Sequence, residues 1–393
     1  MTSFEFATAA RILFGPGKVQ ELAGAIRRLG TRVLLVCGAS TDRAGRVASA
    51  IRSTPHHIFS VPGEPTLEAV RQGVETARSL GCDVVVAVGG GSPIDAGKAI
   101  ASLLANGGDP LDYLEVVGKG LPIERPSVPF LAIPTTAGAG AEVTRNAVLK
   151  ATGYGVKASL RSPYLLANMA IVDPELSCSM PKPVTAATGM DALTQLIEPY
   201  VSVRANPMTD MLCVEGMRLV ARSLERAFHN GSDLEARQEM AFASLLGGMA
   251  LANAGLGAVH GFAAPIGGAF EAPHGAVCAA LLAPTMQVNL KALRQRQPNS
   301  FALDRYAHVA QILTGQPHAS PEDGVRWVGE LAARLEIPPL GCYGLGAGHI
   351  ADLTAKAAQS SSMKGNPISL EPDELAAILS AAIGHAKLSG QLY

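Results

Sequence analysis

Up to residue 175 the chain alternates short apolar runs with segments of helical periodicity, which limits it to few architectures. The apolar runs are continuous, as is typical of parallel strands covered on both faces. They lie at Val33–Cys37, His57–Val61, Val84–Val88 and Phe130–Ile133. Between them the pattern predicts helices at Gly17–Leu29, Gly45–Ser53, Thr66–Leu80 (with Thr66 as N-cap) and Ile94–Ala105. This order predicts a doubly wound α/β domain.

After residue 180 strand-like runs disappear and helical periodicity dominates. The expected helices are Val184–Val201, Pro207–Phe228, Leu234–Ala254, Ala276–Leu293, Phe301–Ile312, Pro321–Leu335 and Pro372–Ala386. The change falls near Asp173–Pro181, where the sequence DPELSCSMP carries two prolines. We therefore expect an α/β domain over residues 1–178 and an all-helical domain over residues 179–393.

Composition excludes several classes of protein. The 393 residues include 32 Lys and Arg against 33 Asp and Glu, so the net charge of −1 gives no electrostatic footprint for nucleic acid or an anionic membrane. A hydrophobic fraction of 48% excludes disorder. The low charged fraction of 17% indicates much buried or subunit-covered surface, so we expect a homodimer or larger homo-oligomer.

The cysteines and the N-terminus indicate a cytoplasmic protein. The six cysteines are scattered without a C-x-x-C pair, which argues against a disulfide scaffold or a zinc ribbon and favours reduced thiols. The start of the chain, MTSFEFATAARILFG, lacks the basic residues and apolar run of a signal peptide.

One uncharged stretch, Met240–Phe270, is long enough to span a membrane. It is crowded with Gly and Ala, contains Asn253 and His260, and has no flanking basic clusters. These features favour a buried helix pair over a membrane helix, so no membrane partner is expected.

Two glycine-rich loops follow predicted strands. The first, Gly89–Asp95 (GGGSPID), leads from Val84–Val88 into a helix, where free N–H groups and the helix dipole can bind phosphate. It is neither G-x-G-x-x-G nor a Walker A sequence, and a tight turn that needs small residues is the alternative. The second, Ile133–Thr144, carries hydroxyls and glycines. Two such loops at the carboxyl ends of strands indicate a dinucleotide site.

Asp191, His260 and His274 form a candidate metal site, with Gln195 beside Asp191. Asp191 and Gln195 are four residues apart, so on a helix they share one face. His260 lies in the uncharged stretch, where an imidazole needs a polar partner or a metal. One Asp and two His can bind Fe²⁺ or Zn²⁺ and leave a position for a substrate oxygen. A satisfied core histidine is the alternative.

Together these segments resemble the iron-containing (group III) alcohol dehydrogenases. The motifs GGGSPIDAGKAIA, IPTTAGAGAEVT, AIVDP, GMDALTQLIEPY and GLGAVHGFAAPIGGAFEAPHG occur in the family's order and at about its spacing, over essentially the whole chain. The resemblance implies a dehydroquinate synthase-like fold. In this fold an N-terminal dinucleotide-binding α/β domain and an all-α C-terminal domain enclose the active site in the cleft between them.

The resemblance also implies roles for individual residues. Three sets of positions match: the pyrophosphate loop (Gly90, Gly91, Ser92 and Asp95), the cofactor cleft (Thr135, Thr136, Thr144 and Lys157), and the metal ligands (Asp191, Gln195, His260 and His274). Among the ligands, Asp191, His260 and His274 are the implied catalytic residues.

Two positions depart from the family pattern. Gln195 stands where the family usually has His, and its amide oxygen is a weaker donor, which lowers affinity for Fe²⁺ or Zn²⁺ and leaves a metal-free enzyme open. Ala264 stands where many members carry a further His, so the substrate proton is expected to pass through water or the cofactor ribose.

The cofactor preference can be argued from Gly38 and Ser40. NAD-preferring relatives often carry Asp at the position of Gly38, where it repels a 2′-phosphate. Gly38 removes this repulsion and Ser40 can donate a hydrogen bond, so we expect NADP(H) to be used with a slight preference over NAD(H).

The leading interpretation is an NAD(P)-dependent oxidoreductase that interconverts a small alcohol and its aldehyde or ketone by hydride transfer. A divalent metal, Fe²⁺ or Zn²⁺, would polarise the substrate oxygen. A metal-independent reductase of the maleylacetate type, acting on an acidic carbonyl substrate, is one alternative. A non-catalytic nucleotide-binding relative is the other. No nucleic-acid partner is expected.

Overall fold

A six-stranded parallel sheet forms the centre of the N-terminal half in the computed structural model, which describes residues 3–384. The strand order is β1-β8-β5-β4-β2-β3, with β1 at Ile12–Phe14, β2 at Val33–Cys37, β3 at His56–Ser60, β4 at Val84–Gly89, β5 at Phe130–Pro134 and β8 at Met169–Val172. Successive side chains of the central strands pack into two different cores, one on each face, as the continuous apolar runs predict.

The helices of this half are α1 (Leu22–Ile26), α2 (Thr41–Ala50), α3 (Leu67–Ser79), α4 (Gly91–Asn106) and the short α5 (Pro110–Tyr113). Thr66 caps α3 as predicted, since its hydroxyl accepts a hydrogen bond from Ala69 N at 3.1 Å. The helix predicted at Gly17–Leu29 is instead a 3₁₀ turn at Lys18–Glu21 followed by α1. The predicted start at Gly45 is also wrong, because α2 begins four residues earlier.

Four strands were not predicted. Strands β1 and β8 are only three and four residues long, too short to show a periodicity. Strands β6 (Asn146–Ala151) and β7 (Val156–Arg161) form a separate antiparallel hairpin, whose residues alternate between buried and half-buried in β6. The turn between them contains Gly155 in the left-handed region, with φ of 63°.

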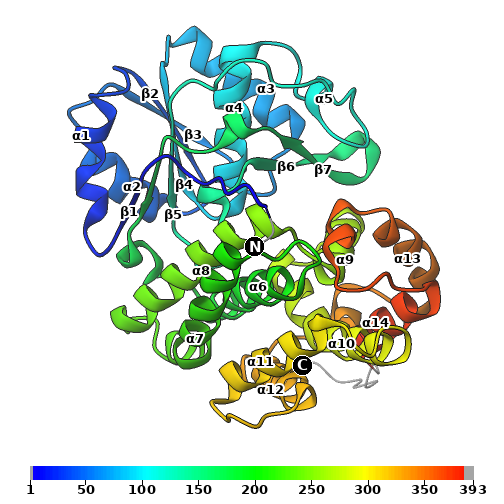
Figure 1. The fold of residues 1–393 in the computed structure, drawn as a ribbon. Coiled ribbons are helices and arrows are strands. Elements are labelled where there is room, and N and C mark those ends of the chain that lie inside the picture. Colours follow the sequence, from blue (N-terminus) through cyan, green and yellow to red (C-terminus); the bar gives the residue numbers. More distant parts are fainter. Residues whose placement is uncertain (1–2, 385–393) are drawn as a thin grey trace, which may run out of the picture.

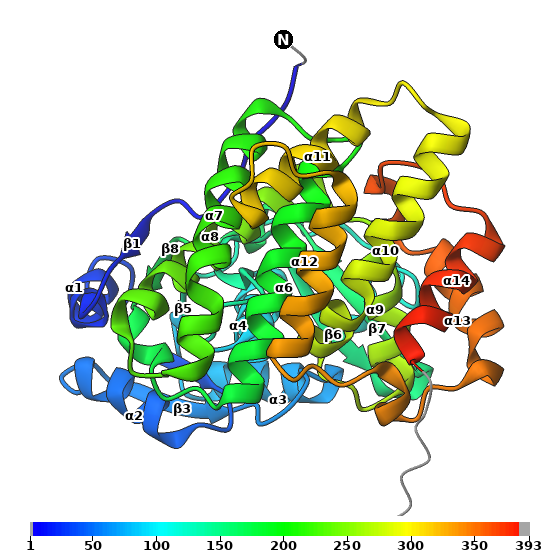
Figure 2. The same ribbon diagram turned by 90° about the horizontal axis from the view of Figure 1, so that it is seen from below.

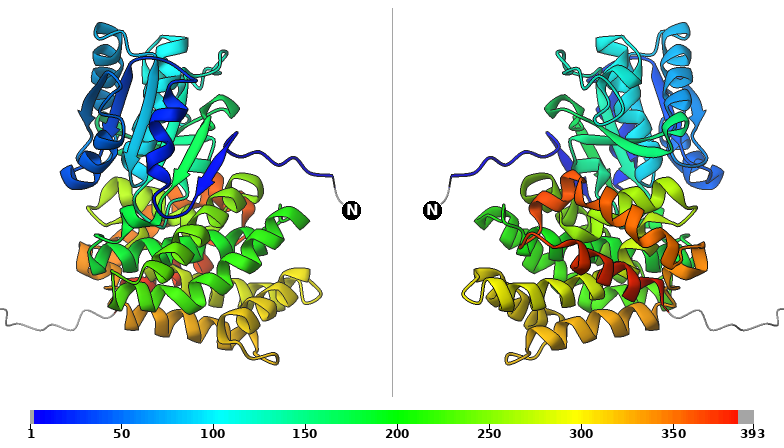
Figure 3. Two further views of the ribbon diagram at one scale, coloured as in Figure 1. Left: turned by 90° about the vertical axis from the view of Figure 1, so that its left-hand side faces the viewer. Right: turned by 90° about the vertical axis from the view of Figure 1, so that its right-hand side faces the viewer.

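The second half is helical, and the two halves are stacked on one another (Figure 1, Figure 3). Its helices are α6 (Lys182–Val201), α7 (Pro207–His229), α8 (Leu234–Ala254), α9 (Ala258–Ala269), α10 (His274–Arg296), α11 (Phe301–Thr314), α12 (Pro321–Arg334), α13 (Ile350–Ala358) and α14 (Pro372–Ile383). The predicted helices agree within a few residues, but α13 was missed, and the end predicted at Ala386 lies outside the described residues. The proposed domain boundary at residues 178 and 179 lies between the 3₁₀ turn at Pro174–Ser177 and α6.

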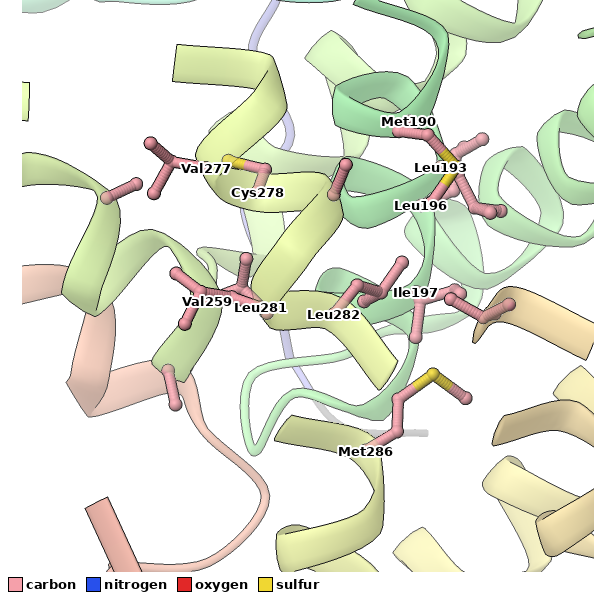
Figure 4. Close-up of a cluster of buried hydrophobic side chains, with 14 of the residues drawn as sticks. Met190, Leu193, Leu196, Ile197, Val259, Val277, Cys278, Leu281, Leu282 and Met286 are labelled. Atoms are coloured by element: carbon pink, nitrogen blue, oxygen red, sulfur yellow. The ribbon is translucent and has the colours of Figure 1, made fainter. Parts of the chain in front are cut away.

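Helix α6 runs through the middle of the helical half, against α7, α8 and α10 (Figure 2). Its residues from Gly189 to Val201 are all buried, so it is covered on every side. Figure 4 shows apolar side chains of α6, α9 and α10 packed together in this core. Polar residues on α6 are therefore held in an environment where they need a partner.

The uncharged stretch forms the buried helix pair α8 and α9, bent by 100° at a short break. Among the described residues, α10 is the one helix long and apolar enough by itself to cross a membrane, and this pair passes the same test if it is counted as one span. In α10, 67% of the apolar window is buried inside the protein. The length and composition of these helices fit core helices.

Close backbone contacts join the two halves at the loop after β5. A Cβ atom on Gly140 would lie 2.4 Å from Gly248 Cα on α8, and one on Gly138 would lie 2.7 Å from Thr188 Cβ on α6. Gly140 also has φ of +58°, a conformation that other residues rarely adopt. The loop therefore packs directly onto the helical half without intervening side chains.

We expect Gly248→Ala to destabilise the protein, because the new Cβ would lie 2.5 Å from the carbonyl oxygen of Gly140, a backbone atom that cannot rotate away. Overpacking of this kind costs about 1–3 kcal/mol. The midpoint of thermal unfolding measures the effect. Gly45→Ala is the matched control, since nothing lies within 4 Å of its Cβ. Equal midpoints for the two variants would contradict the prediction.

Candidate active site

The two glycine-rich loops lie side by side at the carboxyl edge of the sheet. Gly89 pairs with Pro134 in adjacent strands, and Thr135 N donates to Gly89 O at 2.8 Å. A Cβ on Gly90 would lie 3.3 Å from Thr136 Oγ1. No side chain of the described residues caps α4 at Gly90, so its first N–H groups face the space beside the second loop. This geometry suits an anionic ligand.

Two residues assigned to the cofactor site, Asp95 and Thr144, form contacts with other protein groups in this structure. Asp95 Oδ2 accepts a hydrogen bond from Val148 N at 3.0 Å, and Asp95 Oδ1 lies 3.5 Å from Lys98 Nζ. Lys98 in turn donates to Thr144 Oγ1 at 2.8 Å. Asp95, at the end of the first loop, and Thr144, at the end of the second, therefore take part in contacts that tie α4 to β6 and to the second loop. Ser92 is half-buried at the second position of α4.

Sequence reasoning missed Lys98 and Glu142, which belong to this network. Burial lowers the pKa of Lys98 and raises that of Glu142 to about 7. Lys98 follows Asp95 by three residues within one helix, and charged pairs commonly form at this spacing. The spacing was the signal in the sequence that could have identified Lys98.

The turn after β2 brings a cation to the same region. Gly38 leaves room for a side chain, because a Cβ there would lie 3.7 Å from Pro93 Cγ, an ordinary contact. Ser40 is at the N-cap of α2, where its hydroxyl caps nothing. Arg43, which was not predicted, donates to the carbonyl of Thr135 at 3.5 Å, while its buried Nε has no partner among the described residues. The guanidinium thus lies between this turn and the second loop.

Lys157 lies on β7, beside the helical half. Its Nζ forms an ion pair with Glu64 at 3.0 Å, and a Cβ on Gly267 of α9 would lie 3.1 Å from it. The hairpin that carries Lys157 is therefore packed against α9.

Three of the four predicted metal ligands converge at one buried point. Asp191 Oδ1 lies 3.3 Å from His260 Nε2 and 3.8 Å from His274 Nε2. The three residues come from three different helices, α6, α9 and α10, so only the tertiary packing brings them together. The side chains of Asp191 and His260 are 5% and 7% exposed, whereas that of His274 is 40% exposed. A ligand would therefore enter on the side of His274.

Glu198, a residue that sequence reasoning missed, fixes the orientation of His260. Its Oε2 lies 2.6 Å from His260 Nδ1, and its Oε1 accepts a hydrogen bond from Val259 N at 2.7 Å. With the Nδ1 proton directed at Glu198, neutral His260 presents the Nε2 lone pair to Asp191. Carboxylates commonly orient metal-binding histidines in this way. Glu198 is one helical turn beyond Thr194, inside the motif GMDALTQLIEPY.

The fourth predicted ligand, Gln195, is buried one turn after Asp191 on α6, as expected. Gln195 Oε1 and Asp191 Oδ1 are both buried without a hydrogen-bond partner among the described residues. Such orphaned oxygens are costly in a protein interior unless a cation or another donor satisfies them. The residues present therefore fit a divalent metal ion. Cys278, which was not predicted, adds its Sγ to the cluster of Asp191, His260 and His274.

Comparison with known proteins identifies the family. Residues 9–174 match the family described as iron-containing alcohol dehydrogenase, and residues 185–383 match the C-terminal part of the Fe-containing alcohol dehydrogenase family. The chain belongs to the iron-containing alcohol dehydrogenase family. This confirms the predicted fold class and shows that the protein is an alcohol dehydrogenase, which interconverts an alcohol and its carbonyl compound. It also supports a nicotinamide cofactor and a metal.

Individual relatives of this alcohol dehydrogenase match over most of their length. Long-chain-alcohol dehydrogenase 1 of Geobacillus thermodenitrificans is 37% identical over 395 residues, which cover 95% of this chain and 97% of that protein. The NAD-dependent methanol dehydrogenase of Bacillus methanolicus is 37% identical over 80% of each chain. The crystal structure of a 1,3-propanediol oxidoreductase has a TM-score of 0.89 at 33% identity, covering 97% of this chain and 100% of that one.

The charges in the active site of the alcohol dehydrogenase are strongly coupled. Burial alone would raise the pKa of Asp191, but His274 and His260 lower it below its usual value. Cys278 and Asp191 raise the pKa of His274 to about 8. Burial alone would lower the pKa of His260, yet Cys278, Asp191 and Glu198 raise it well above 6.5. Asp191 is thus an anion at neutral pH, and metal binding would release protons from the cluster.

We expect Glu198→Gln to weaken metal binding by the dehydrogenase about 10–100-fold. The amide has one acceptor, whereas Val259 N and His260 Nδ1 both need one, so the imidazole loses its orientation. Competition with a fluorescent chelator measures the dissociation constant. Glu225→Gln, an exposed change on α7, is the control. Equal affinity in Glu198→Gln and the control would show that Glu198 does not orient the ligand.

Proposed function

We propose that this alcohol dehydrogenase depends on a divalent metal held by Asp191, His260 and His274. The observation that carries the proposal is the convergence of their donor atoms within 4.8 Å of one another. The buried, partnerless oxygens of Asp191 and Gln195 support it. Gln195, at the fourth position implied by the resemblance, is proposed to contribute its amide oxygen more weakly.

The residues of the chain have distinct tasks in this reaction. When bound, the metal supplies Lewis-acid polarisation of the substrate oxygen, and the nicotinamide supplies or accepts the hydride. Asp191, His260 and His274 would hold the metal, and Glu198 would keep the ring of His260 oriented for binding through Nε2. The apolar walls of α6, α9 and α10 exclude water behind the site, which strengthens the electrostatic interactions inside it.

The dinucleotide is proposed to lie across the two glycine-rich loops. Gly90, Gly91 and Ser92 would offer backbone N–H groups to the pyrophosphate, and Thr135 and Thr136 would line the cleft. At the ends of the two loops, Asp95 and Thr144 would hold them in shape through Val148 and Lys98. Lys157 would line the cleft from the side of the hairpin.

The substrate proton needs a path to solvent. Ala264, one turn after His260 on α9, carries no ionisable group. We therefore propose that the proton moves through water or the cofactor ribose on the open side of the site, where His274 is exposed.

The substrate is proposed to be a small alcohol, with its aldehyde or ketone as product. Relatives are named for methanol, 1,3-propanediol and long-chain alcohols. We further propose a cytoplasmic homodimer or larger homo-oligomer without nucleic-acid or membrane partners. The balanced charge and the charged fraction of 17% support these proposals.

The test of metal dependence is elemental analysis before and after chelation, coupled to NADPH oxidation on a panel of aldehydes and ketones. We expect near-stoichiometric metal, and loss of activity when it is removed. His260→Ala should lower kcat/KM by about 100-fold or more, because the lost donor weakens both binding and positioning. His229→Ala, an exposed histidine on α7, is the control.

Full activity of the metal-depleted enzyme would overturn this proposal and favour the metal-free reductase. In that case His260→Ala would change kcat no more than His229→Ala does.

The proposed preference for NADP(H) is tested by Gly38→Asp. A Cβ at Gly38 would make only an ordinary contact with Pro93, and the carboxylate would repel a 2′-phosphate near Ser40 and Arg43. We expect the ratio of kcat/KM for NADPH to that for NADH to fall about tenfold, equivalent to about 1.4 kcal/mol. Gly45→Asp is the control. A wild-type ratio that favours NADH tenfold would contradict the preference.

A further inference from the structure

Cys278 occupies a position that no other cysteine of the described chain shares. Its Sγ lies 3.8 Å from His260 Nε2 and 3.7 Å from His274 Nε2. It follows His274 by one helical turn on α10, so both side chains leave the helix on the same face. The residue is completely buried.

The separations between donor atoms match a tetrahedral zinc site. Bonds of about 2.0–2.1 Å to nitrogen or oxygen and about 2.3 Å to sulfur place neighbouring ligand atoms about 3.4–3.6 Å apart. Four of the six pairs are separated by 3.3 Å, 3.7 Å, 3.8 Å and 3.8 Å, and the other two, Asp191 with Cys278 and His260 with His274, lie within 4.8 Å. A cation at the centre therefore needs only small side-chain movements.

Among the described residues, the groups around Cys278 favour a role as metal ligand. The orientation imposed by Glu198 turns Nε2 of His260 toward Asp191 Oδ1 and Cys278 Sγ. When His260 and Cys278 release their protons, three electron-rich atoms face one another. Such an arrangement is stabilised by a positive charge at its centre.

A buried cysteine can also serve as a small apolar side chain. Cys213 on α7 is an example, because it lies in the helical core and burial raises the pKa of its thiol. Figure 4 shows Cys278 next to Val277 at the edge of the same core. The difference is that Cys278 also contacts two imidazoles.

Gln195 competes with Cys278 for the role of fourth ligand. Its Cβ lies against α8, where a Cβ on Gly247 would be 3.4 Å away. An amide oxygen is a hard, neutral donor, whereas a thiolate is soft, anionic and favoured by zinc. The thiol of Cys278 lies within 4.8 Å of the donor atoms of Asp191, His260 and His274.

We propose that Cys278 is a metal ligand, and that this chain binds Zn²⁺ through Asp191, His260, His274 and Cys278. The inference rests on the metal site of the proposed function. It keeps Asp191, His260 and His274 as ligands and adds Cys278 in place of Gln195. The fourth protein ligand then comes from α10 and not from the Gln195 position on α6.

The experiment is X-ray absorption spectroscopy at the zinc edge of the full-length protein loaded with one equivalent of Zn²⁺. We expect one sulfur neighbour at about 2.3 Å together with nitrogen and oxygen neighbours at about 2.0–2.2 Å. In Cys278→Ser the sulfur neighbour should disappear, and zinc affinity should fall about 100-fold or more. Cys213→Ser, which removes a buried thiol outside the cluster, should leave the spectrum unchanged.

The Co²⁺-substituted protein gives an independent readout, since thiolate ligation produces a sulfur-to-metal charge-transfer band in the near ultraviolet. This band should be present in the wild type, in Gln195→Ala and in Cys213→Ser, and absent in Cys278→Ser. Circular dichroism and NADPH binding confirm that each variant is folded.

A zinc spectrum with nitrogen and oxygen neighbours but no sulfur would overturn the role of Cys278 while leaving the metal site itself intact. A sulfur signal that survives in Cys278→Ser would overturn it as well. A protein that binds Fe²⁺ but no Zn²⁺ would overturn the zinc site while leaving the proposed function intact, and one that binds neither metal would contradict the proposed metal-dependent function.

Discussion

The active site depends on one close contact between the two halves of the molecule. The loop after β5 carries the threonines that are proposed to line the cofactor cleft, and its glycines touch α6 and α8 directly. Any side chain at Gly138 or Gly140 would separate the halves and open the cleft. Because α6 also carries Asp191, this contact sets the position of the cofactor loops relative to the candidate metal site. Hydride transfer requires that these two sites be placed within fractions of an ångström.

The candidate metal site also requires that three helices be held in fixed orientations, because its members lie on α6, α9 and α10. Helix α6 is buried all round, which prevents it from rotating and keeps Asp191 and Glu198 directed at α9. Glu198 joins them by bonding both the backbone of Val259 and the ring of His260. The apolar packing among these helices therefore does more than stabilise the domain: it orients polar groups that would otherwise be costly to bury.

Much of this could be predicted from the sequence, and the exceptions have physical reasons. Continuous apolar runs identified β2, β4 and β5, since strands covered on both faces must be apolar throughout. The sequence did not predict strands β1 and β8, because three or four residues are too few to show a periodicity in hydrophobicity. Among site residues, Asp191, Gln195, His260 and His274 were found through the family resemblance. Glu198 and Arg43 were missed, because their partners lie far away in the chain and only packing brings them close. Cys278 was missed although it follows His274 by one helical turn, because a buried cysteine more often serves as a small apolar side chain.

The departure at Gln195 and the presence of Cys278 are best understood together. A histidine on α6 would supply one neutral donor beside Asp191, and its replacement by glutamine removes most of that binding strength. A thiolate on α10, one turn after His274, restores a strong donor and adds a negative charge. With Cys278 as the proposed fourth ligand, the ligand count is kept while the donor set becomes softer, which would favour zinc over iron. Side-chain exchange between two facing helices can thus change the metal without changing the fold.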